Sequence, residues 1–278
     1  MQIIDGKALA ADIRSQVKQK IQTSGLHPKL AVLLVGDDPA SHLYVKLKEK
    51  AAHEAGIETD IRRLPDTTNE EELRAIIQNW NADKTVNAIL IQIPLPKKYD
   101  QDALIALMDP AKDVDGFHPK NLAALAHGTA EIFPPVHEGI LHLIGATDIS
   151  LNGTSAVIIA NSDIFSAPLA RLLTRAGCVV AKFTPENYER EAVKDADILV
   201  AAVGRPKFLT PDLIKSGACV IDVGTNRLPD GKVVGDVDAE NLKTTAGWLS
   251  PVPGGVGPMT VAMLLKNTLA LAKRPASV

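Results

Sequence analysis

The strongest constraint on the fold of this chain is an alternation of short apolar runs with amphipathic helical stretches. In the first half, Leu30–Gly36 and Val86–Ile93 are nearly continuous apolar runs, each flanked by residues with helical spacing. Runs of this length are typical of parallel strands that are buried on both faces. Strands that alternate with helices indicate βαβ units, so we expect an α/β fold.

The second half of the sequence repeats this alternation. Its apolar runs are Ala156–Ala160, Val179–Phe183, Ile198–Val203 and Cys219–Val223. Helical stretches separate them, which predicts a doubly wound parallel sheet. Because 278 residues exceed the usual size of one domain, we expect two α/β lobes. We place their boundary near residues 117–135, with a ligand cleft between the lobes.

Local signals predict where several helices begin and end. Residues 37–39 start a helix that Gly56 closes, because proline favours the first turn and glycine favours the residue after the last. Thr68 and Glu71 fit a capping box in front of the next helix. The stretch Val261–Ala272 is helical by pattern.

Composition and charge disfavour several classes of protein. A net charge of −3 shows no basic excess of the kind that nucleic-acid binders carry. Cys178 and Cys219 both lie in apolar runs, which predicts reduced core thiols rather than a disulfide framework. Zinc-ligand spacing, a membrane-length apolar run and a signal peptide are all missing. We therefore expect a cytoplasmic protein with no metal site, no membrane segment and no nucleic-acid partner.

A first candidate constellation is Ser41, Tyr44 and Lys48, whose spacings of three and four put them on one helix face. A tyrosine can stack on a flat ring, and a lysine with a lowered pKa can act as a general base. Exposed Tyr/Lys pairs without any function have the same spacing, so both interpretations remain open. Gln92 lies inside a predicted apolar strand and needs polar partners, either as an ordinary core or edge amide or as a group that orients Lys48.

Two loops carry further candidates. In the Lys-Asp-Val-Asp-Gly sequence of residues 112–116, a carboxylate can accept two parallel N–H donors of a ring, or can be a solvated turn residue. Residues 251–260 contain three prolines and three glycines in front of the final helix. Backbone of this kind can approach a ligand closely, and we interpret it as functional rather than as a linker.

The first βα turn of the second lobe, residues 157–168, is where a dinucleotide-binding lobe meets a pyrophosphate. It lacks a G-x-G-x-x-G sequence. Ser162 could bond a phosphate at the helix start, whereas Asp163 carries the wrong charge for a phosphate but suits a helix N-terminus. From its residues alone, this turn is a weak nucleotide site.

Taken together and in this order, these motifs resemble bifunctional methylenetetrahydrofolate dehydrogenase/methenyltetrahydrofolate cyclohydrolase. The resemblance spans nearly the whole chain. It is carried by Ser41-x-x-Tyr44-x-x-x-Lys48, Gln92-x-Pro94-Leu95-Pro96, residues 112–116 and residues 251–260. Val203-Gly204-Arg205-Pro206, Ile221-Asp222-Val223-Gly224 and Gly235-Asp236-Val237 fit the same pattern.

The resemblance implies two lobes around a cleft, in a cytoplasmic homodimer. Residues 1–119, joined by a C-terminal helix at 258–278, would form an N-terminal α/β folate-binding catalytic lobe. Residues 120–257 would form a C-terminal Rossmann-like nucleotide-binding lobe with a parallel sheet. The implied substrates are tetrahydrofolate derivatives of one-carbon metabolism, which serves purine biosynthesis, and the implied cofactor is NADP, or NAD.

The resemblance also assigns roles to individual residues. It implies that Lys48 assists the attack of water on the methenyl carbon, Gln92 orients Lys48, Tyr44 stacks along the folate and Asp115 holds the pterin ring. The implied catalytic residues are Lys48, Tyr44, Gln92 and Asp115, and the implied substrate-binding residues are Ser41, Tyr44, Asp115, Pro253, Gly254 and Gly255. The implied cofactor-binding residues are Asn161, Ser162, Asp163, Val203, Gly204 and Thr225.

The departures from the family pattern all fall on the cofactor side. Ala160-Asn161-Ser162 stands where the family has Gly-Arg-Ser, so the arginine that normally holds the NADP phosphate is missing. Pro134-Pro135-Val136-His137 replaces Pro-Cys-Thr-Pro, Phe165-Ser166-Ala167-Pro168 replaces Val-Gly-x-Pro, and Phe183–Glu186 offers an acid in place of His-Ser-Arg/Lys. We therefore expect a retained cyclohydrolase step and an NADP-dependent dehydrogenase step that is weak, shifted towards NAD or lost.

Three alternatives remain open. The chain is a fully bifunctional NADP enzyme with an atypical pocket, a Rossmann oxidoreductase with a non-folate substrate, or a non-catalytic protein that binds folate or a partner. The complete set of Tyr44, Lys48, Gln92 and Asp115 argues against the last two.

Overall fold

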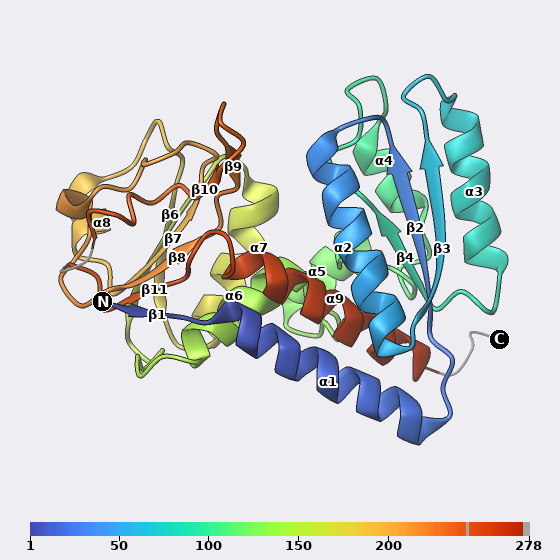
Figure 1. The fold of residues 1–278 in the computed structure, drawn as a ribbon, viewed down its shortest axis with the longest axis horizontal. Helices are drawn as coiled ribbons and strands as arrows, with labels where there is room; N and C mark the ends of the chain where they lie inside the picture. Colours follow the sequence, from blue (N-terminus) through green and yellow to red (C-terminus); the bar gives the residue numbers. More distant parts are fainter. Residues whose placement is uncertain (243–244, 275–278) are drawn as a thin grey trace. The chain divides into compact units, whose positions relative to one another are not determined.

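The computed structural model describes residues 1–242 and 245–274, which fall into two compact units (Figure 1). The first, here the 11–135 unit, holds Ala11–Pro135 and the chain from Val261 onward. The second, here the 136–260 unit, holds Met1–Ala10 and Val136–Thr260. Each unit contains its own parallel sheet with helices packed on it, as expected for an α/β fold of two lobes.

This division differs from the sequence-based boundary at 119/120 at both ends of the first lobe. Residues 120–135 stay with the 11–135 unit, because Asn121 donates hydrogen bonds to the carbonyl of Pro110 and to Asp113. The first ten residues join the other unit, because the N–H of Ile4 donates to the carbonyl of Leu249. Of the helix expected at 258–278, residues 256–272 are helical in the structure, and residues 275–278 lie outside the described residues.

The sheet of the 11–135 unit has the strand order β3-β2-β4, all parallel. Its strands are β2 (Lys29–Val35), β3 (Glu58–Leu64) and β4 (Ala88–Ile91). Its helices are α2 (Pro39–Ala55), α3 (Glu70–Ala82), α4 (Gln101–Leu107) and α5 (Pro119–His127). Two further helices run across the division of the chain, α1 (Gly6–Ser24) and α9 (Val256–Ala272).

Alternate residues of the central strand β2 pack on opposite sides of this sheet. Leu30, Val32 and Leu34 belong to an apolar cluster with residues of α2 and α9, whereas Ala31 and Leu33 belong to a second cluster with α3 and α4. A strand buried on both faces reads as a continuous apolar run, which is why the sequence identified it.

Some details of this unit depart from the sequence expectations. The capping box at Thr68 is wrong: the cap of α3 is Asn69, whose side chain accepts a hydrogen bond from the N–H of Glu72. Thr68 lies outside the helix because its carbonyl accepts from the hydroxyl of Tyr99. The start and end of α2 are as expected, with Asp38 as its N-cap and Gly56 in the left-handed conformation at φ 85°.

The 136–260 unit contains a six-stranded parallel sheet of order β1-β11-β8-β7-β5-β6. Its strands are β5 (Ser155–Ala160), β6 (Val179–Phe183), β7 (Ile198–Ala202), β8 (Cys219–Asp222) and the short β1 (Gln2–Ile3) and β11 (Trp248–Leu249). Around it lie α6 (Pro135–Gly145), α7 (Asp163–Arg175), α8 (Arg190–Lys194), a 3₁₀ turn at Pro211–Leu213 and an antiparallel pair formed by β9 (Asn226–Arg227) and β10 (Val233–Val234).

The four main strands of this sheet are those that the sequence predicts, and their order confirms the doubly wound arrangement. Strand β5 lies between β6, which follows it in the chain, and β7, which pairs with its other edge. In open α/β sheets a ligand binds beyond the carboxyl ends of the strands at such a switch point. The turn after β5 is therefore placed at the expected ligand-binding edge.

Candidate active site

The structure brings Lys48 and Gln92 into direct contact within the 11–135 unit. Lys48 lies on α2 and is only 8% exposed, and its Nζ donates a 2.9 Å hydrogen bond to Oε1 of Gln92. Gln92 lies immediately after β4 rather than inside it, and its Nε2 donates to the carbonyl of Ile93. Burial lowers the pKa of Lys48, and the nearby charge of Asp115 partly opposes that shift. A lowered pKa makes the neutral form of the amine, which can accept a proton, easier to reach.

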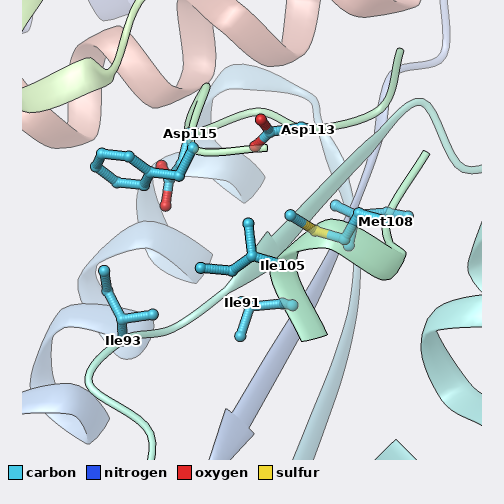
Figure 2. Close-up of a pocket in the computed structure, with 8 residues that line it drawn as sticks. Ile91, Ile93, Ile105, Met108, Asp113 and Asp115 are labelled. Carbon is cyan, nitrogen blue, oxygen red and sulfur yellow. The ribbon is translucent and has the colours of Figure 1, made fainter. Parts of the chain in front are cut away.

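Asp115 supplies a carboxyl group beside this lysine. Burial raises its pKa to about 6, with a contribution in the same direction from Asp113 and an opposing one from Lys48. Asp115 and Asp113 enter the site from one loop above Ile91, Ile93 and Ile105 (Figure 2). The small pocket there is lined by Ile89, Ile91, Ile93, Ile105, Met108, Asp113, Asp115 and Phe117. The space enclosed there is about 10 Å³, which is room for about one water molecule.

Asp113 shapes the loop that presents Asp115, a role for which the sequence analysis gave no reason. It is fully buried, and its carboxylate accepts hydrogen bonds from the N–H groups of Gly116 and His118 and from Nδ2 of Asn121, at 2.8–3.0 Å. The loop is also joined to β4, because the N–H of Ile89 donates to the carbonyl of Lys112. The spacing of an aspartate three residues before a glycine was the available signal.

Ser41 and Tyr44 lie on α2 in the two turns before Lys48. Ser41 is buried and its N–H donates to the carboxylate of Asp38, while Tyr44 is half-buried. Lys46, which lies between Tyr44 and Lys48 on α2, is exposed. The predicted helix face therefore exists, with Ser41 and Lys48 buried and Tyr44 half-buried.

The proline- and glycine-rich segment, residues 251–260, lies in the 136–260 unit at the start of α9. The N–H of Gly255 donates to the carbonyl of Pro251 at 2.7 Å, which closes a tight turn. A Cβ atom at Gly6 would lie 2.4 Å from the carbonyl oxygen of Gly255, and Gly254 has φ 119°. Close backbone packing explains Gly6 and Gly255, and the positive φ explains Gly254. Pro253, Gly254 and Gly255 belong to a different unit from Lys48.

The candidate cofactor turn follows β5. Nδ2 of Asn161 donates a 2.8 Å hydrogen bond to the carbonyl of Val203, so it links the turn after β5 to the loop after β7, where Gly204 has φ 66°. Ser162 is the N-cap residue of α7, although its side chain does not cap the helix. An open pocket of about 540 Å³ lies here, lined by Ala160, Asn161, Ser162, Asp163, Ser166, Lys182, Phe183, Thr184, Asn187 and Glu189.

An ion pair lies in this pocket. Asp163, the first residue of α7, accepts hydrogen bonds from Nζ of Lys182 at 2.9 Å and from Oγ of Ser166 at 3.0 Å. The hydrogen bond from Lys182 makes the largest contribution to lowering the pKa of the Asp163 carboxyl. Lys182 is a member of β6 that the sequence analysis did not single out, although a lysine inside an apolar strand next to this turn was a usable signal.

Two buried carboxylates hold the loops that follow β7 and β8. Asp236 accepts hydrogen bonds from the N–H groups of Val203, Gly204 and Arg205, at 2.6, 3.1 and 2.9 Å. Asp222 accepts from the N–H groups of Gly224, Asp236 and Val237, and burial raises its pKa to about 6. These contacts fix Val203 and Gly204 beside Asn161.

Thr225, the last of the expected cofactor residues, is exposed in the loop after β8. Thr225, Val203 and Gly204 are not among the residues that line the pocket, whereas Asn161, Ser162 and Asp163 are. The next residue, Asn226, donates a 2.8 Å hydrogen bond from Nδ2 to Asp236, which connects this loop to the one that holds Val203.

His137, one of the departures noted in the sequence, lies inside the core of the 136–260 unit. It is fully buried, its ring lies 4.9 Å from that of Phe165, and burial lowers its pKa to about 3. The imidazole is therefore neutral at physiological pH. The structure gives it a packing role next to α7.

Comparisons with known proteins match both parts of the chain to one family. The family model described as tetrahydrofolate dehydrogenase/cyclohydrolase, catalytic domain, matches residues 4–115, and the NAD(P)-binding domain of the same family matches residues 134–276. A bifunctional protein FolD from Bacillus cytotoxicus is 46% identical over 276 residues, which cover 98% of this chain and 96% of the relative.

Solved structures give the same result. The bifunctional enzyme FolD from Campylobacter jejuni is similar with a TM-score of 0.94 and 42% identity, covering 98% of this chain and 99% of that one. The Trypanosoma brucei methylenetetrahydrofolate dehydrogenase-cyclohydrolase, solved with NADP and an inhibitor, has a TM-score of 0.92 and 32% identity, with 98% and 97% covered. On these similarities, this chain belongs to the tetrahydrofolate dehydrogenase/cyclohydrolase family.

Proposed function

We propose that this protein hydrolyses methenyltetrahydrofolate at the site of Lys48, Gln92 and Asp115. The observation that carries the proposal is the buried hydrogen bond between Lys48 and Gln92 beside the carboxyl of Asp115. The relatives named above are bifunctional enzymes of this chemistry, and all the residues that the resemblance assigns to the folate side of the 11–135 unit are present.

The reaction needs little beyond a positioned water and a base of moderate pKa. The methenyl carbon is part of a cationic amidinium, so it is already electrophilic. Lys48 in its neutral form accepts a proton from water as the new C–O bond forms, and that proton returns to the ring nitrogen whose bond to the same carbon then breaks. The remaining hydroxyl proton is released to solvent as the formyl C=O bond forms. Gln92 holds the amine in place, Asp115 accepts the N–H donors of the pterin ring and Tyr44 stacks along the folate.

The proposal is tested by following the loss of methenyltetrahydrofolate absorbance in the wild-type protein and in Gln92→Leu. The substitution removes the buried acceptor of Lys48, so we expect kcat to fall about 10- to 100-fold, equivalent to about 1–3 kcal/mol. An inactive wild-type protein, or a Gln92→Leu variant at full rate, contradicts the proposal.

For the dehydrogenase step, we propose that a dinucleotide binds at the turn after β5 and that NADP binds more weakly than NAD, or too weakly for activity. The residues present fit most of such a molecule, because the start of α7 and the open pocket beside it can take a pyrophosphate and a ribose. They do not fit a 2′-phosphate well, because Asp163 and Glu189 bring negative charge to the pocket and the family arginine is Asn161.

When bound, the dinucleotide supplies a hydride acceptor, and the protein's part is to hold it. Asn161, Val203 and Gly204 set the shape of the crevice, Ser162 and Asp163 form the start of α7, and Thr225 follows on the next loop. Calorimetric titration with NAD and with NADP tests this proposal. Tight binding of NADP, with NAD no tighter, would contradict it.

The remaining alternatives separate in the same experiments. A fully bifunctional NADP enzyme binds NADP tightly, an oxidoreductase with another substrate leaves methenyltetrahydrofolate unchanged, and a non-catalytic binding protein binds folate without turnover. We also propose a cytoplasmic homodimer of a folate-binding lobe and a nucleotide-binding lobe, as the resemblance implies, and light scattering of the purified protein measures the dimer directly. A mass equal to one chain would contradict the dimer.

A further inference from the structure

The pocket beside the turn after β5 has an unusual arrangement of charge. Of the described residues that line it, Lys182 is the one cation, while Asp163 and Glu189 are acids. Lys182 is already occupied, because its Nζ donates to the carboxylate of Asp163 at 2.9 Å. Nearby, Arg205 is likewise paired with Glu186. Both of these basic side chains therefore have carboxylate partners.

The position of the Asp163–Lys182 pair in the sheet relates it to the choice between ligands with and without a 2′-phosphate. In a doubly wound sheet the first βα turn receives the pyrophosphate, and the end of the following strand lies by the adenosine ribose. Asp163 begins the helix after that turn, and Lys182 is the penultimate residue of the following strand, β6. At this place an acid favours a ribose 2′-hydroxyl, and a cation favours a 2′-phosphate.

The ion pair itself contributes little stability. The side chain of Asp163 is 83% exposed and that of Lys182 is 36% exposed, and exposed pairs of this kind add little to folding. The charges on the two side chains nevertheless affect what can bind beside them, because the Asp163 carboxylate neutralises the ammonium of Lys182 and repels a phosphate.

We propose that the Asp163–Lys182 ion pair is the determinant that excludes a 2′-phosphate from this pocket. The inference rests on the proposed dinucleotide site and specifies how that site discriminates. Asp163 repels the phosphate and holds the one lysine that would otherwise bind it. Without the Asp163 carboxylate, Lys182 becomes a phosphate ligand and takes over the task of the missing family arginine.

The test uses two probes that differ by one group, adenosine 5′-monophosphate and adenosine 2′,5′-bisphosphate, titrated by calorimetry into the full chain. We expect Asp163→Asn to tighten binding of the bisphosphate about tenfold or more, as a new charge-assisted contact would, and to change binding of the monophosphate about twofold at most. Asp163→Ser, which keeps a polar side chain at the helix start, is expected to show the same gain.

Two further variants identify the cause of the gain. In the double variant Asp163→Asn/Lys182→Met, the gain for the bisphosphate is expected to disappear, because the lysine makes it. Asp195→Asn removes an exposed carboxylate at the end of α8, outside the pocket lining, and controls for net charge. Each variant should show the wild-type thermal unfolding midpoint.

The outcomes separate this inference from the proposed function. If wild type binds NAD but Asp163→Asn and Asp163→Ser leave the preference between the two probes unchanged, the inference is overturned and the dinucleotide site stands. If Asp195→Asn gives the same gain, or if the gain persists without Lys182, the ion pair is not the determinant. If the wild-type protein binds neither NAD nor the monophosphate, the proposed cofactor site fails and the inference fails with it.

Discussion

At the scale of single residues, the two candidate sites differ in how the protein sets charge. In the 11–135 unit, burial lowers the pKa of Lys48 and raises that of Asp115, which favours the neutral form of each. In the 136–260 unit, the exposed Asp163 has its pKa lowered by hydrogen bonds, the first of them from Lys182. The first arrangement is suited to proton transfer, and the second to selection by charge.

The pKa of Asp115 leads to a pH prediction. Because its folded-state pKa is about 6, the carboxylate is ionised above that pH and loses an acceptor oxygen as pH falls through it. We expect the KM for methenyltetrahydrofolate to rise as pH is lowered from 7 to 5, roughly tenfold per pH unit at the acid end. Steady-state kinetics across this range measure it. A KM that stays constant would show that Asp115 does not bind the substrate in its ionised form.

His137 gives a prediction about stability. Its folded-state pKa of about 3 lies below the value for an unfolded chain, so the unfolded state binds the proton and stability is lost as pH falls below 6.5. On lowering the pH from 7 to 5, this group should reduce the free energy of unfolding by about 2 kcal/mol. That value corresponds to the roughly 1.5 pH units between the unfolded-state pKa of 6.5 and pH 5.

Urea unfolding at both pH values checks this prediction for His137. His137→Leu should remove that part of the pH dependence relative to wild type. A variant whose stability falls between the two pH values by the same amount as wild type would contradict the buried, neutral histidine.

Some residue roles were accessible from the sequence and some were not. Lys48, Gln92 and Asp115 were identified because motif order carries over from a family, and the structure then placed Lys48 and Gln92 in contact. Lys182 was missed because its meaning depends on strand pairing, which brings β6 beside the turn of Asp163. The lysine inside an apolar strand was a signal that a polar partner lies nearby, but spacing along one strand does not identify that partner as Asp163.

At the scale of elements, regular buried segments were predicted best. Strands β2, β5, β7 and β8 are mostly apolar and were found. Strand β3 was missed because it is an edge strand with exposed charged residues, among them Arg62 and Arg63. Helix α5 was missed because the expected domain boundary was placed over it.

A substitution of Asp113 tests how the loop of residues 112–116 is held in the conformation that presents Asp115. Removing a buried carboxylate that accepts three hydrogen bonds leaves their donors without a partner. We expect Asp113→Ala to lower the free energy of unfolding by about 2–4 kcal/mol and to raise the KM for the folate substrate. Urea unfolding and kinetics provide the two readouts.

The matched control for Asp113 is Asp12→Asn, which alters an exposed carboxylate on α1. It should leave both quantities close to wild type. Unchanged stability in Asp113→Ala would show that the loop does not depend on this carboxylate.

At the scale of the whole molecule, each unit is built from segments that are far apart in the sequence. The first ten residues complete the sheet of the 136–260 unit through β1 and β11, and the chain from Val261 onward completes the 11–135 unit. Sequence reasoning placed the last helix with the first lobe only through the family resemblance. The pairing of β1 was missed because two residues form too short a pattern. Within the described residues, none of the helices has the length and apolarity that crossing a membrane requires.

A substitution of Asn267 tests how α9 is attached to the rest of the 11–135 unit. It is 4% exposed, and its Nδ2 donates to the carbonyls of Val114 and Phe133, at 3.0 and 2.9 Å. Asn267→Ala should therefore lower the free energy of unfolding by about 1–3 kcal/mol. Urea unfolding measures it, with Lys273→Ala as the control, because Lys273 is exposed in the turn that follows α9. Equal stability of the two variants would exclude this role for Asn267.

The central claim is that the buried amine of Lys48 carries the hydrolysis. Its most direct test compares wild type, Lys48→Met and Lys46→Met for the loss of methenyltetrahydrofolate absorbance, with no dinucleotide added. Lys46 is the exposed lysine on the same helix, so it controls for loss of charge from α2. We predict that Lys48→Met lowers kcat about 100-fold or more while Lys46→Met keeps the wild-type rate. A Lys48→Met variant that hydrolyses the substrate at the wild-type rate would contradict the assignment.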